Sequence, residues 1–359
     1  MQICSTGGTV DITVHEVLDG GKLKELHAAS GGDWGGANVD SAFRQMLIKL
    51  FSNPILKQFQ NRFMDDYLDI FRDFEIKKRD LKPAGDSKIT IRVPITLKQL
   101  FEDETEEFIQ EAIDQSSYKG QMTFTGDKLR IDPSVFRHMF DSPIENIVEH
   151  VSGLLRDPST RGTTSILMVG GFSESVMLQT AIKNTFPQMT VIVPEGAGLV
   201  VLKGAVIFGH DPNGIAKRIC RHTYGIEINS PFDATHDTSK RFVSDGRAFC
   251  KEVFDKHVEI GQSLNYGEVQ SERTYAPLAD TDDTLDFVLY ASDQRAPRYV
   301  TEKGCQRIGK LTVKVGDKSV PLHQRTLCVS LTFSGTEIVV RANEQRTGKV
   351  TDCKLNFLD

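Results

Sequence analysis

Two adjacent-glycine turns, each attached to a short apolar strand, constrain this 359-residue chain more than any other feature. Gly7-Gly8 lies between an apolar start at 1–5 and the alternating segment 10–14, whose period of two predicts a half-buried strand. Gly170-Gly171 follows the apolar segment 165–169, which is typical of a strand covered on both faces. Because glycine lets consecutive N–H groups converge on an anion, two such turns can hold a phosphate chain and a nucleoside across a cleft. An ordinary hairpin is the alternative for Gly7-Gly8 taken alone.

A third glycine pair, Gly35-Gly36, follows a second hairpin signal at 19–21 and opens a helical pattern. Strand, turn, strand, turn, strand and then a glycine pair before a helix is a layout typical of nucleotide sites. The rest of this region, 36–160, is predicted to be a helical and mixed insertion lobe. Apolar spacing predicts helices at 39–50, 59–80, 97–113 and 132–155, a strand at 88–93 and a hairpin around 125–127.

After the second glycine turn, Ser173 is expected to cap a helix that reaches Phe186, and a strand at 190–193 and an apolar helix to Gly209 follow. Past residue 211 helical periodicity gives way to short alternating segments. We therefore expect two domains, 1–210 and 211–359, the second being rich in β-strands. Its predicted strands are 223–228, 284–291, 309–315, 328–333, 337–342 and 350–357.

Charge and cysteine usage narrow the class of protein. The net charge is −6, from 43 basic and 49 acidic residues, which argues against a nucleic-acid binder or a protein that binds anionic membranes. The six cysteines form no CxxC pair, so reduced thiols in a cytoplasmic protein are expected. The longest apolar run, 199–208, contains Lys203 and is too short to span a bilayer.

The common nucleotide and hydrolase fingerprints GxxxxGK[ST], GxGxxG and GxSxG are absent. Three other segments, STGGTVDIT at 5–13, GDWGGANVD at 32–40 and LMVGGFSE at 167–174, resemble the 70-kDa heat shock protein family. The tryptophan, the Gly-Gly-Phe variant and GLVVLKGAVIFG at 198–209 resemble its divergent 12A/12B branch. Segments of the β region resemble that branch too, so the similarity runs essentially from residue 1 to 359.

This resemblance implies an α/β plus β fold: the second half of an actin-like ATPase (ribonuclease H-like) nucleotide-binding domain, followed by a β-rich peptide-binding-like domain. ATP or ADP is the implied cofactor. The phosphate-binding residues implied by position are Gly7, Gly8, Thr9, Gly35 and Gly36. The adenosine-binding residues implied are Glu75, Lys78, Arg79, Gly170, Gly171, Ser173 and Gly198. No catalytic residue or metal ligand is carried over.

The charged run 75–80 has two interpretations. Its residues can be a solvated helix end, with cations near the negative pole of the helix dipole. Alternatively, two cations and a carboxylate on one helix face can hydrogen-bond ribose hydroxyls and stack on a purine.

The departures from the family pattern concern the phosphate side. Cys4 stands where the family has an aspartate that helps to hold the water shell of Mg²⁺, and Thr6 replaces the first of three glycines. The family's first phosphate loop, its catalytic lysine and its first lobe would precede this stretch, so we expect an N-terminally truncated relative. Because phosphoryl transfer depends on charges and donors around the γ-phosphate, we expect weak ATP or ADP binding without hydrolysis and little support for Mg²⁺.

Three functional classes remain open. The first is a heat-shock-like nucleotide-binding protein, the second a non-enzymatic interaction module that uses the C-terminal β domain, and the third another actin-like protein such as a sugar kinase, which the β segments disfavour. The expected partners are proteins or peptides bound by the β domain, and neither nucleic acid nor membrane. Self-association is also expected, because strand 1–5 would be an uncovered edge unless strand 165–169 or 190–193 pairs with it.

Overall fold

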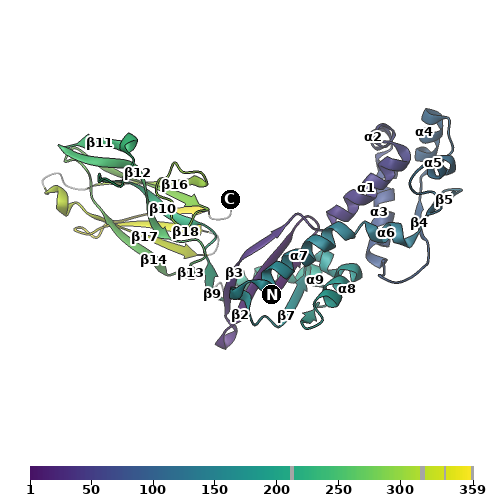
Figure 1. The fold of residues 1–359 in the computed structure, drawn as a ribbon, viewed down its shortest axis with the longest axis horizontal. Coiled ribbons are helices and arrows are strands. Elements are labelled where there is room, and N and C mark those ends of the chain that lie inside the picture. The colour runs from purple at the N-terminus through teal and green to yellow at the C-terminus, as the bar shows by residue number, and fades with distance from the viewer. Residues whose placement is uncertain (211–213, 316–319, 335–336, 357–359) are drawn as a thin grey trace. The chain divides into compact units, whose positions relative to one another are not determined.

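The computed structural model describes residues 1–210, 214–315, 320–334 and 337–356, and its contacts divide the chain into two compact units. The first unit comprises 1–14 and 29–207, and the second comprises 15–28 and 208–359. Both are drawn in Figure 1, and each is described by itself below. The predicted combination of α/β and β structure is confirmed at this level, since the first unit mixes helices with sheets and the second is built from strands. The sequence analysis placed the boundary at 210–211 and so assigned segment 15–28 to the first domain. The contacts instead group this segment with the second unit.

The first unit is built on a sheet in which β1 has a partner on each side. β1 pairs antiparallel with β2 and parallel with β7, and β7 pairs parallel with β8. Strand 165–169, one of the two partners named as exceptions in the sequence analysis, pairs with residues 1–5, so these residues do not form an uncovered edge. The alternation that predicted β2 is confirmed, with Val10, Ile12 and Val14 buried. The strands are β1 (Gln2–Ser5), β2 (Val10–Val17), β3 (Leu23–Gly32), β7 (Ser165–Val169) and β8 (Thr190–Ile192).

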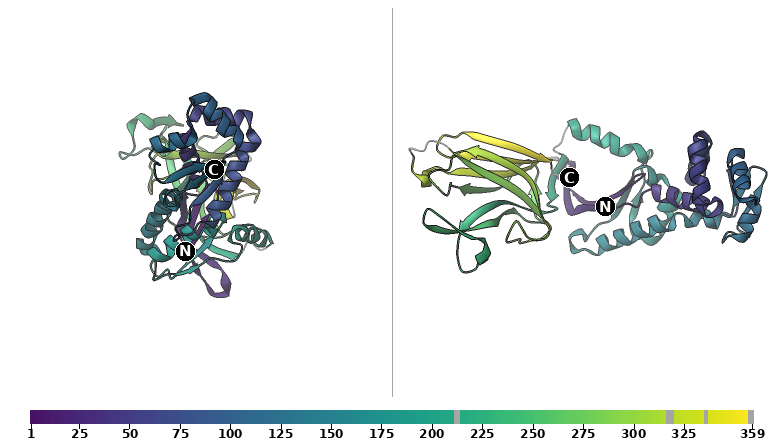
Figure 2. Two further views of the ribbon diagram at one scale, coloured as in Figure 1. Left: turned by 90° about the vertical axis from the view of Figure 1, so that its right-hand side faces the viewer. Right: turned by 90° about the horizontal axis from the view of Figure 1, so that it is seen from above.

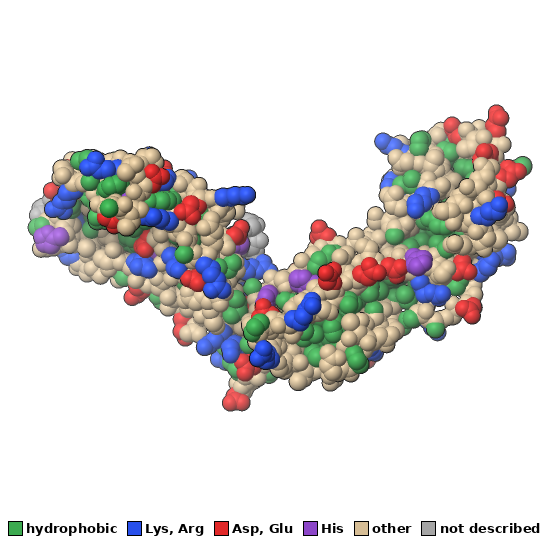
Figure 3. All heavy atoms as spheres, in the orientation of Figure 1, with side chains coloured by type: hydrophobic (Ala, Val, Ile, Leu, Met, Phe, Trp, Pro, Cys, Tyr) green, Lys and Arg blue, Asp and Glu red, His purple; other side chains and the backbone are tan. Residues whose placement is uncertain are grey.

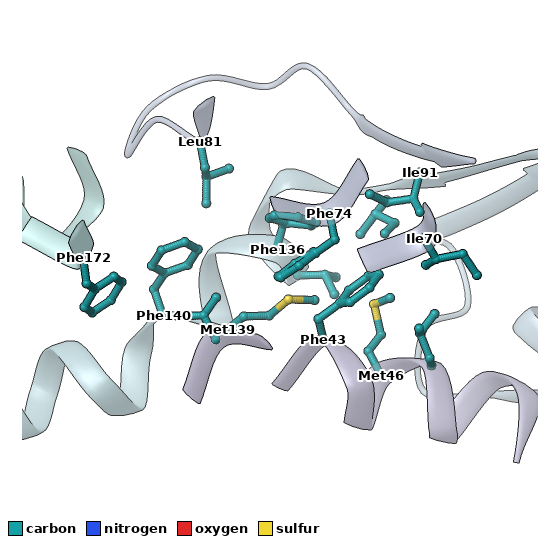
Figure 4. Close-up of a cluster of buried hydrophobic side chains, with 14 of the residues drawn as sticks. Phe43, Met46, Ile70, Phe74, Leu81, Ile91, Phe136, Met139, Phe140 and Phe172 are labelled. Carbon is teal, nitrogen blue, oxygen red and sulfur yellow. The ribbon is translucent and has the colours of Figure 1, made fainter. Parts of the chain in front are cut away.

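A helical region with its own three-stranded sheet lies between β3 and β7 in the sequence. Its core is aromatic: Phe43 and Phe74 stack with ring centroids 3.9 Å apart, and the cluster continues to Phe136 (Figure 4). Its elements are α1 (Ala37–Phe51), α2 (Asn53–Arg62), α3 (Met64–Asp80), β4 (Ile89–Arg92), α4 (Ile95–Thr105), α5 (Ile109–Gln115), β5 (Met122–Thr125), β6 (Lys128–Ile131), α6 (Pro133–His138) and α7 (Asp141–Arg156).

Three segments predicted as single helices are each split in two. The breaks fall at Phe63, at 106–108 and at 139–140. At the second break Glu106 adopts a left-handed conformation with φ 57°. The apolar period continues across each break because both halves bury side chains in the same core, so periodicity alone could not locate the breaks. The predicted helix start at Asp132 is confirmed, since its carboxylate accepts a hydrogen bond from the Ser134 N–H.

The segment after β7 begins with a 3-10 turn rather than with the predicted helix. Ser173 was expected to cap that helix, but its buried hydroxyl donates to the Val169 carbonyl at 2.7 Å. The elements that follow are η3 (Gly171–Glu174), α8 (Val176–Thr185) and α9 (Ala197–His210). Further 3-10 turns are η1 (Asp19–Gly21), η2 (Pro158–Thr160), η5 (Thr238–Lys240) and η6 (Leu322–Gln324).

α9 is apolar yet exposed. Leu199, Val201, Leu202, Val206 and Ile207 are between 46 and 68 % exposed, although helices that are apolar all round are normally buried. Within the described residues, no helix combines the length and apolar character that crossing a membrane requires.

The second unit is a sandwich of two antiparallel sheets, which the right-hand view of Figure 2 shows as two layers. Tyr224 packs on Phe333 and Tyr275 on Phe287, so aromatic rings join the sheets in one core. Beside the sandwich, β9 (Ile215–Ile219) pairs with the start of β3 and with β13 (Ser263–Asn265). One sheet has the order β11 (Arg241–Ser244), β12 (Arg247–Val258), β10 (Thr223–Pro231), β15 (Thr284–Ser292) and β16 (Cys305–Lys314). The other has the order β14 (Val269–Tyr275), β17 (Leu327–Ser334), β18 (Glu337–Glu344) and β19 (Val350–Asn356).

Candidate functional site

A cavity of about 450 Å³ in the first unit brings both glycine turns to one place. Gly7 of the first turn and Gly171 of the second both line it, although 164 positions separate them in the chain. Its size falls within the range of about 300–1,000 Å³ that small-molecule sites occupy. The lining residues are Gly7, Gly36, Asp40, Glu75, Lys78, Arg79, Phe140, Gly171, Phe172, Glu174 and Ser175.

Charged side chains of α3 form one wall of the cavity. Glu75, Lys78 and Arg79 stand at i, i+3 and i+4, so they share a helix face. The Lys78 ammonium lies 2.6 Å from Glu75 Oε2 and 2.5 Å from Asp40 Oδ1 of α1, and the side chain is only 11 % exposed. Arg79 Nε lies 2.7 Å from Glu75 Oε1, and the Arg79 side chain is 67 % exposed. The wall therefore offers two partly exposed carboxylates, which a largely covered lysine holds in place, and one arginine that reaches solvent.

These contacts determine the protonation states of Glu75 and Arg79. Burial raises the pKa of Glu75, but hydrogen bonds from Lys78 and Arg79 outweigh it, so the pKa lies below its ordinary value. The hydrogen bond to Glu75 raises the pKa of Arg79. At neutral pH both groups are charged, and the carboxylate oxygens can accept hydrogen bonds from a ligand's hydroxyl groups.

Two aromatic side chains form an apolar part of the cavity lining. Phe140, at the start of α7, and Phe172, in η3, stack with ring centroids 6.3 Å apart, and Figure 4 shows them side by side at one end of the aromatic core. A Cβ added at Gly36 would lie 3.4 Å from the Phe172 ring, so the glycine admits this ring close to the start of α1. The cavity therefore offers both aromatic rings and charged side chains to a ligand.

The first glycine turn is closed by its own hydrogen bonds. The Thr6 N–H donates to the Thr9 carbonyl at 2.9 Å, and the Thr6 hydroxyl accepts from the Thr9 N–H at 3.2 Å. Thr6 thus helps to close the turn through both its N–H and its hydroxyl.

The start of α1 occupies the remaining carbonyls of that turn. The N–H groups of Gly35, Gly36 and Ala37 donate to the carbonyls of Gly8, Thr6 and Gly7 at 3.1, 3.1 and 2.6 Å. A Cβ at Gly35 would lie 2.6 Å from the Gly7 oxygen, so glycine is needed there for packing. The Gly35 and Gly36 amides, which the sequence assigned to phosphate, are therefore already hydrogen-bonded within the protein.

Cys4 lies beside a carboxylate that the sequence analysis did not single out. In the β1–β2 register Cys4 is opposite Asp11. Burial, and then the negative charge of Asp11, raise the pKa of the Cys4 thiol. The thiol is therefore neutral at physiological pH and cannot replace an aspartate as a hard oxygen ligand.

The structure separates the sequence-derived site residues into two sets. Those that line the cavity are Gly7, Gly36, Glu75, Lys78, Arg79 and Gly171. Those that do not are Gly8, Thr9, Gly35, Gly170, Ser173 and Gly198.

Several residues of the second set support the site through the backbone. Gly170 has φ 89°, and a Cβ there would lie 2.3 Å from the Ser5 carbonyl oxygen, so it lets β7 approach β1. The Gly198 N–H donates to Glu174 Oε1 at 3.1 Å, which ties the start of α9 to a lining residue.

Five lining residues were not foreseen: Asp40, Phe140, Phe172, Glu174 and Ser175. Asp40, Phe172 and Glu174 lie within the glycine-containing segments already identified, so their position there was an available signal. Phe140 had no such signal, because its place depends on the break between α6 and α7. In the part of the chain that the structure describes, no group of three or more His, Cys, Asp or Glu side chains is placed to hold a metal ion.

Comparison with known proteins gives one consistent result. No family model matches the chain. Heat shock 70 kDa protein 12A from Mus musculus and from Homo sapiens are each 31 % identical over 361 residues, covering 99 % of this chain and 53 % of the relative. Heat shock 70 kDa protein 12B from Homo sapiens is 30 % identical over 363 residues, covering 98 % of this chain and 53 % of that protein. The chain thus spans about half the length of the curated relatives it matches.

Proposed function

Because the chain belongs to the 12A/12B branch of the heat shock 70 kDa protein family, we propose that its first unit is the second half of an actin-like nucleotide-binding domain. In this proposal its cavity binds the adenosine part of ATP or ADP weakly, and the nucleotide is not hydrolysed. The proposal concerns these 359 residues and not the longer relatives.

The observation that carries the proposal is the pairing of a charged wall with an aromatic wall around one cavity. Asp40 and Glu75 can accept hydrogen bonds from ribose hydroxyls, while Lys78 holds both carboxylates in place. The exposed Arg79 guanidinium can stack on a purine whose other face meets the ring of Phe172. These residue types fit a nucleoside.

The glycine-turn side does not fit a triphosphate with Mg²⁺. Its Gly35 and Gly36 amides are hydrogen-bonded to the turn, and Cys4 is a neutral thiol. Phosphoryl transfer is accelerated mainly by donors and cations around the transferred group, and this side supplies few of them. We derive no catalytic step for this site.

A phosphate-release assay with ATP and Mg²⁺ tests the absence of hydrolysis. We expect no turnover above a heat-treated control, and the Thr9→Ala variant should be indistinguishable from the parent chain. Turnover that Thr9→Ala abolishes would refute the proposal.

A second candidate function is protein or peptide binding by the β unit, without enzymatic activity. The edge strands β11, β14 and β19 each carry an exposed valine, namely Val243, Val269 and Val350, at 60, 50 and 50 % exposure. An unpaired edge with apolar side chains can accept an extended peptide as a further strand. A fluorescent apolar heptapeptide should then bind the full chain, and Val243→Lys with Val269→Lys should weaken binding. Unchanged binding would exclude β11 and β14.

We also propose that the chain associates with itself. The surface that supports this proposal is the exposed helix α9 and not strand β1. β1 is paired on both sides, whereas α9 exposes five large apolar side chains. Light scattering after size exclusion should show concentration-dependent association, and Leu202→Lys with Ile207→Lys should reduce it.

Neither nucleic acid nor membrane is proposed as a partner. On the face that Figure 3 shows, Lys and Arg side chains are interspersed with Asp and Glu rather than gathered into one broad basic surface.

A further inference from the structure

A second hollow, of about 410 Å³, lies where α3 ends and the loop to β4 begins, and it shares no lining residue with the first cavity. Four cationic side chains line it: Lys77, Lys82, Lys88 and Arg137. Among its described lining residues Asp80 is the one carboxylate. Positive charge is therefore concentrated here in a chain whose net charge is −6.

Among the residues that the structure describes, these four cations make no ion pair, whereas neighbouring cations on α3 do. On α3, Lys78 and Arg79 both pair with Glu75, whereas Lys77, one residue earlier, pairs with no carboxylate in the described part of the chain. The same holds there for Lys82, Lys88 and Arg137. The nearby Asp132 attracts Lys88 and Arg137 only at longer range, and its Oδ1 accepts hydrogen bonds from Ser134. Since like charges in one hollow repel each other, a multiply charged anion would relieve that repulsion.

The hollow is preformed by packed elements. Its base includes Leu81 and Pro133, which are both buried, and its loop is held where Arg137 donates to the Gly85 carbonyl at 3.0 Å. Gly85 has φ 141°, a conformation that favours glycine. Ser87 and Thr90 also line the hollow, and a hydroxyl group can donate a hydrogen bond to an anionic oxygen.

We propose that this hollow binds a small soluble anion that carries several phosphate groups. Four cations and two hydroxyls exceed what a single phosphate requires, and the volume suits a compact molecule. Lys77 and Arg137 are half-buried, whereas Lys82 and Lys88 are exposed. A membrane surface or nucleic acid would therefore meet chiefly Lys82 and Lys88, while a small ligand can reach all four. This proposal does not rest on nucleotide binding in the first cavity.

Calorimetry of the full chain with inorganic triphosphate tests the proposal. We expect one site whose affinity falls as salt rises, because phosphate contacts by Lys and Arg are screened. Lys77→Gln with Arg137→Gln should weaken binding about tenfold or more, a loss of about 1.4 kcal/mol. Saturating adenosine should leave triphosphate binding unchanged.

The matched control is Lys98→Gln with Arg72→Gln. It removes one lysine and one arginine from the same unit, and neither residue lines the hollow. We expect it to bind triphosphate like the parent chain. If Arg137→Gln disturbs the loop, Lys82→Gln with Lys88→Gln provides an independent test, because both side chains are exposed, and it too should weaken binding.

The proposal would be overturned if millimolar triphosphate did not bind, if the control pair weakened binding as much as the test pair, or if adenosine displaced triphosphate. It would also be overturned if the chain sedimented with anionic vesicles in a way that depends on Lys82 and Lys88, while free triphosphate did not bind.

Discussion

The two sides of the first cavity use their polar groups in opposite ways. On the α3 side, Asp40, Glu75 and Arg79 present partly exposed side chains to the cavity. On the glycine-turn side, the amides at the start of α1 are hydrogen-bonded to the carbonyls of Thr6, Gly7 and Gly8. The Gly35-Gly36 pair therefore marks a close approach between two backbone segments, and its N–H groups donate within the protein rather than to an anion. Nucleotide affinity is therefore expected to come mainly from the nucleoside side of the cavity and little from the phosphate side.

The largest expected effect concerns glycines that the backbone packing requires. Gly170→Ala and Gly35→Ala place a Cβ 2.3 and 2.6 Å from backbone oxygens, and Gly170 also has φ 89°. Each should destabilise the chain by about 3 kcal/mol or more, or prevent folding, as overpacking and strain combine. Urea unfolding measures the loss.

Two neighbouring glycines provide the controls for this experiment. A Cβ at Gly171 or Gly8 would have no atom within 4 Å, so Gly171→Ala and Gly8→Ala should fold normally. A Gly35→Ala variant that folds like the parent but loses ATP affinity would instead show that this glycine serves phosphate binding.

Sequence patterns predicted much of this fold because burial is periodic. The alternation at 10–14 and the apolar run at 165–169 gave β2 and β7, and helical spacing gave the core of α1. β12 was missed because its charged residues and the positive φ of Glu252 interrupt the alternation. The helix breaks at Phe63 and Glu106 carry no glycine or proline, so no local signal marked them.

The site was predictable where its geometry is local. Glu75, Lys78 and Arg79 share a helix face by spacing alone, and the structure places all three on the cavity. Phe140 was not predictable, because it reaches Phe172 only through the packing of distant elements. The sequence also could not show that the Gly35 and Gly36 N–H groups are already hydrogen-bonded, because their acceptors lie in a distant segment of the chain.

A smaller effect should follow from removing the lysine of the charged wall. Lys78→Met leaves Asp40 and Glu75 without their shared counter-charge. We expect adenosine affinity to fall about tenfold. Stability should fall by about 1–2 kcal/mol, less than the 3–5 kcal/mol for breaking a fully buried pair, because both carboxylates remain partly exposed.

Lys77→Met is the matched control, on the same helix and without an ion pair among the described residues. Its stability should stay within about 0.5 kcal/mol of the parent chain. Equal losses for the two variants, measured by calorimetry and urea unfolding, would remove the special role given to Lys78.

The smallest effect concerns the turn side. Cys4→Asp would place a second carboxylate opposite Asp11 in the β1–β2 register. Because Mg²⁺ prefers carboxylate oxygens, Mg²⁺ should then raise ADP affinity about threefold in the variant and leave the parent chain unchanged. Cys4→Asn, whose side chain has the shape of aspartate without its charge, should behave like the parent. A parent chain that already responds to Mg²⁺ would show that the turn side organises the metal without an aspartate at position 4.

Calorimetric titration with adenosine, ADP and ATP tests the central claim most directly, using the full chain with Lys77→Gln and Arg137→Gln so that the second hollow does not bind the nucleotide phosphates. If affinity resides on the nucleoside side, the three dissociation constants should agree within about threefold, a difference of less than about 0.7 kcal/mol. ATP binding about tenfold tighter than adenosine, a gap of about 1.4 kcal/mol, would contradict the account and restore the glycine turns as a phosphate site.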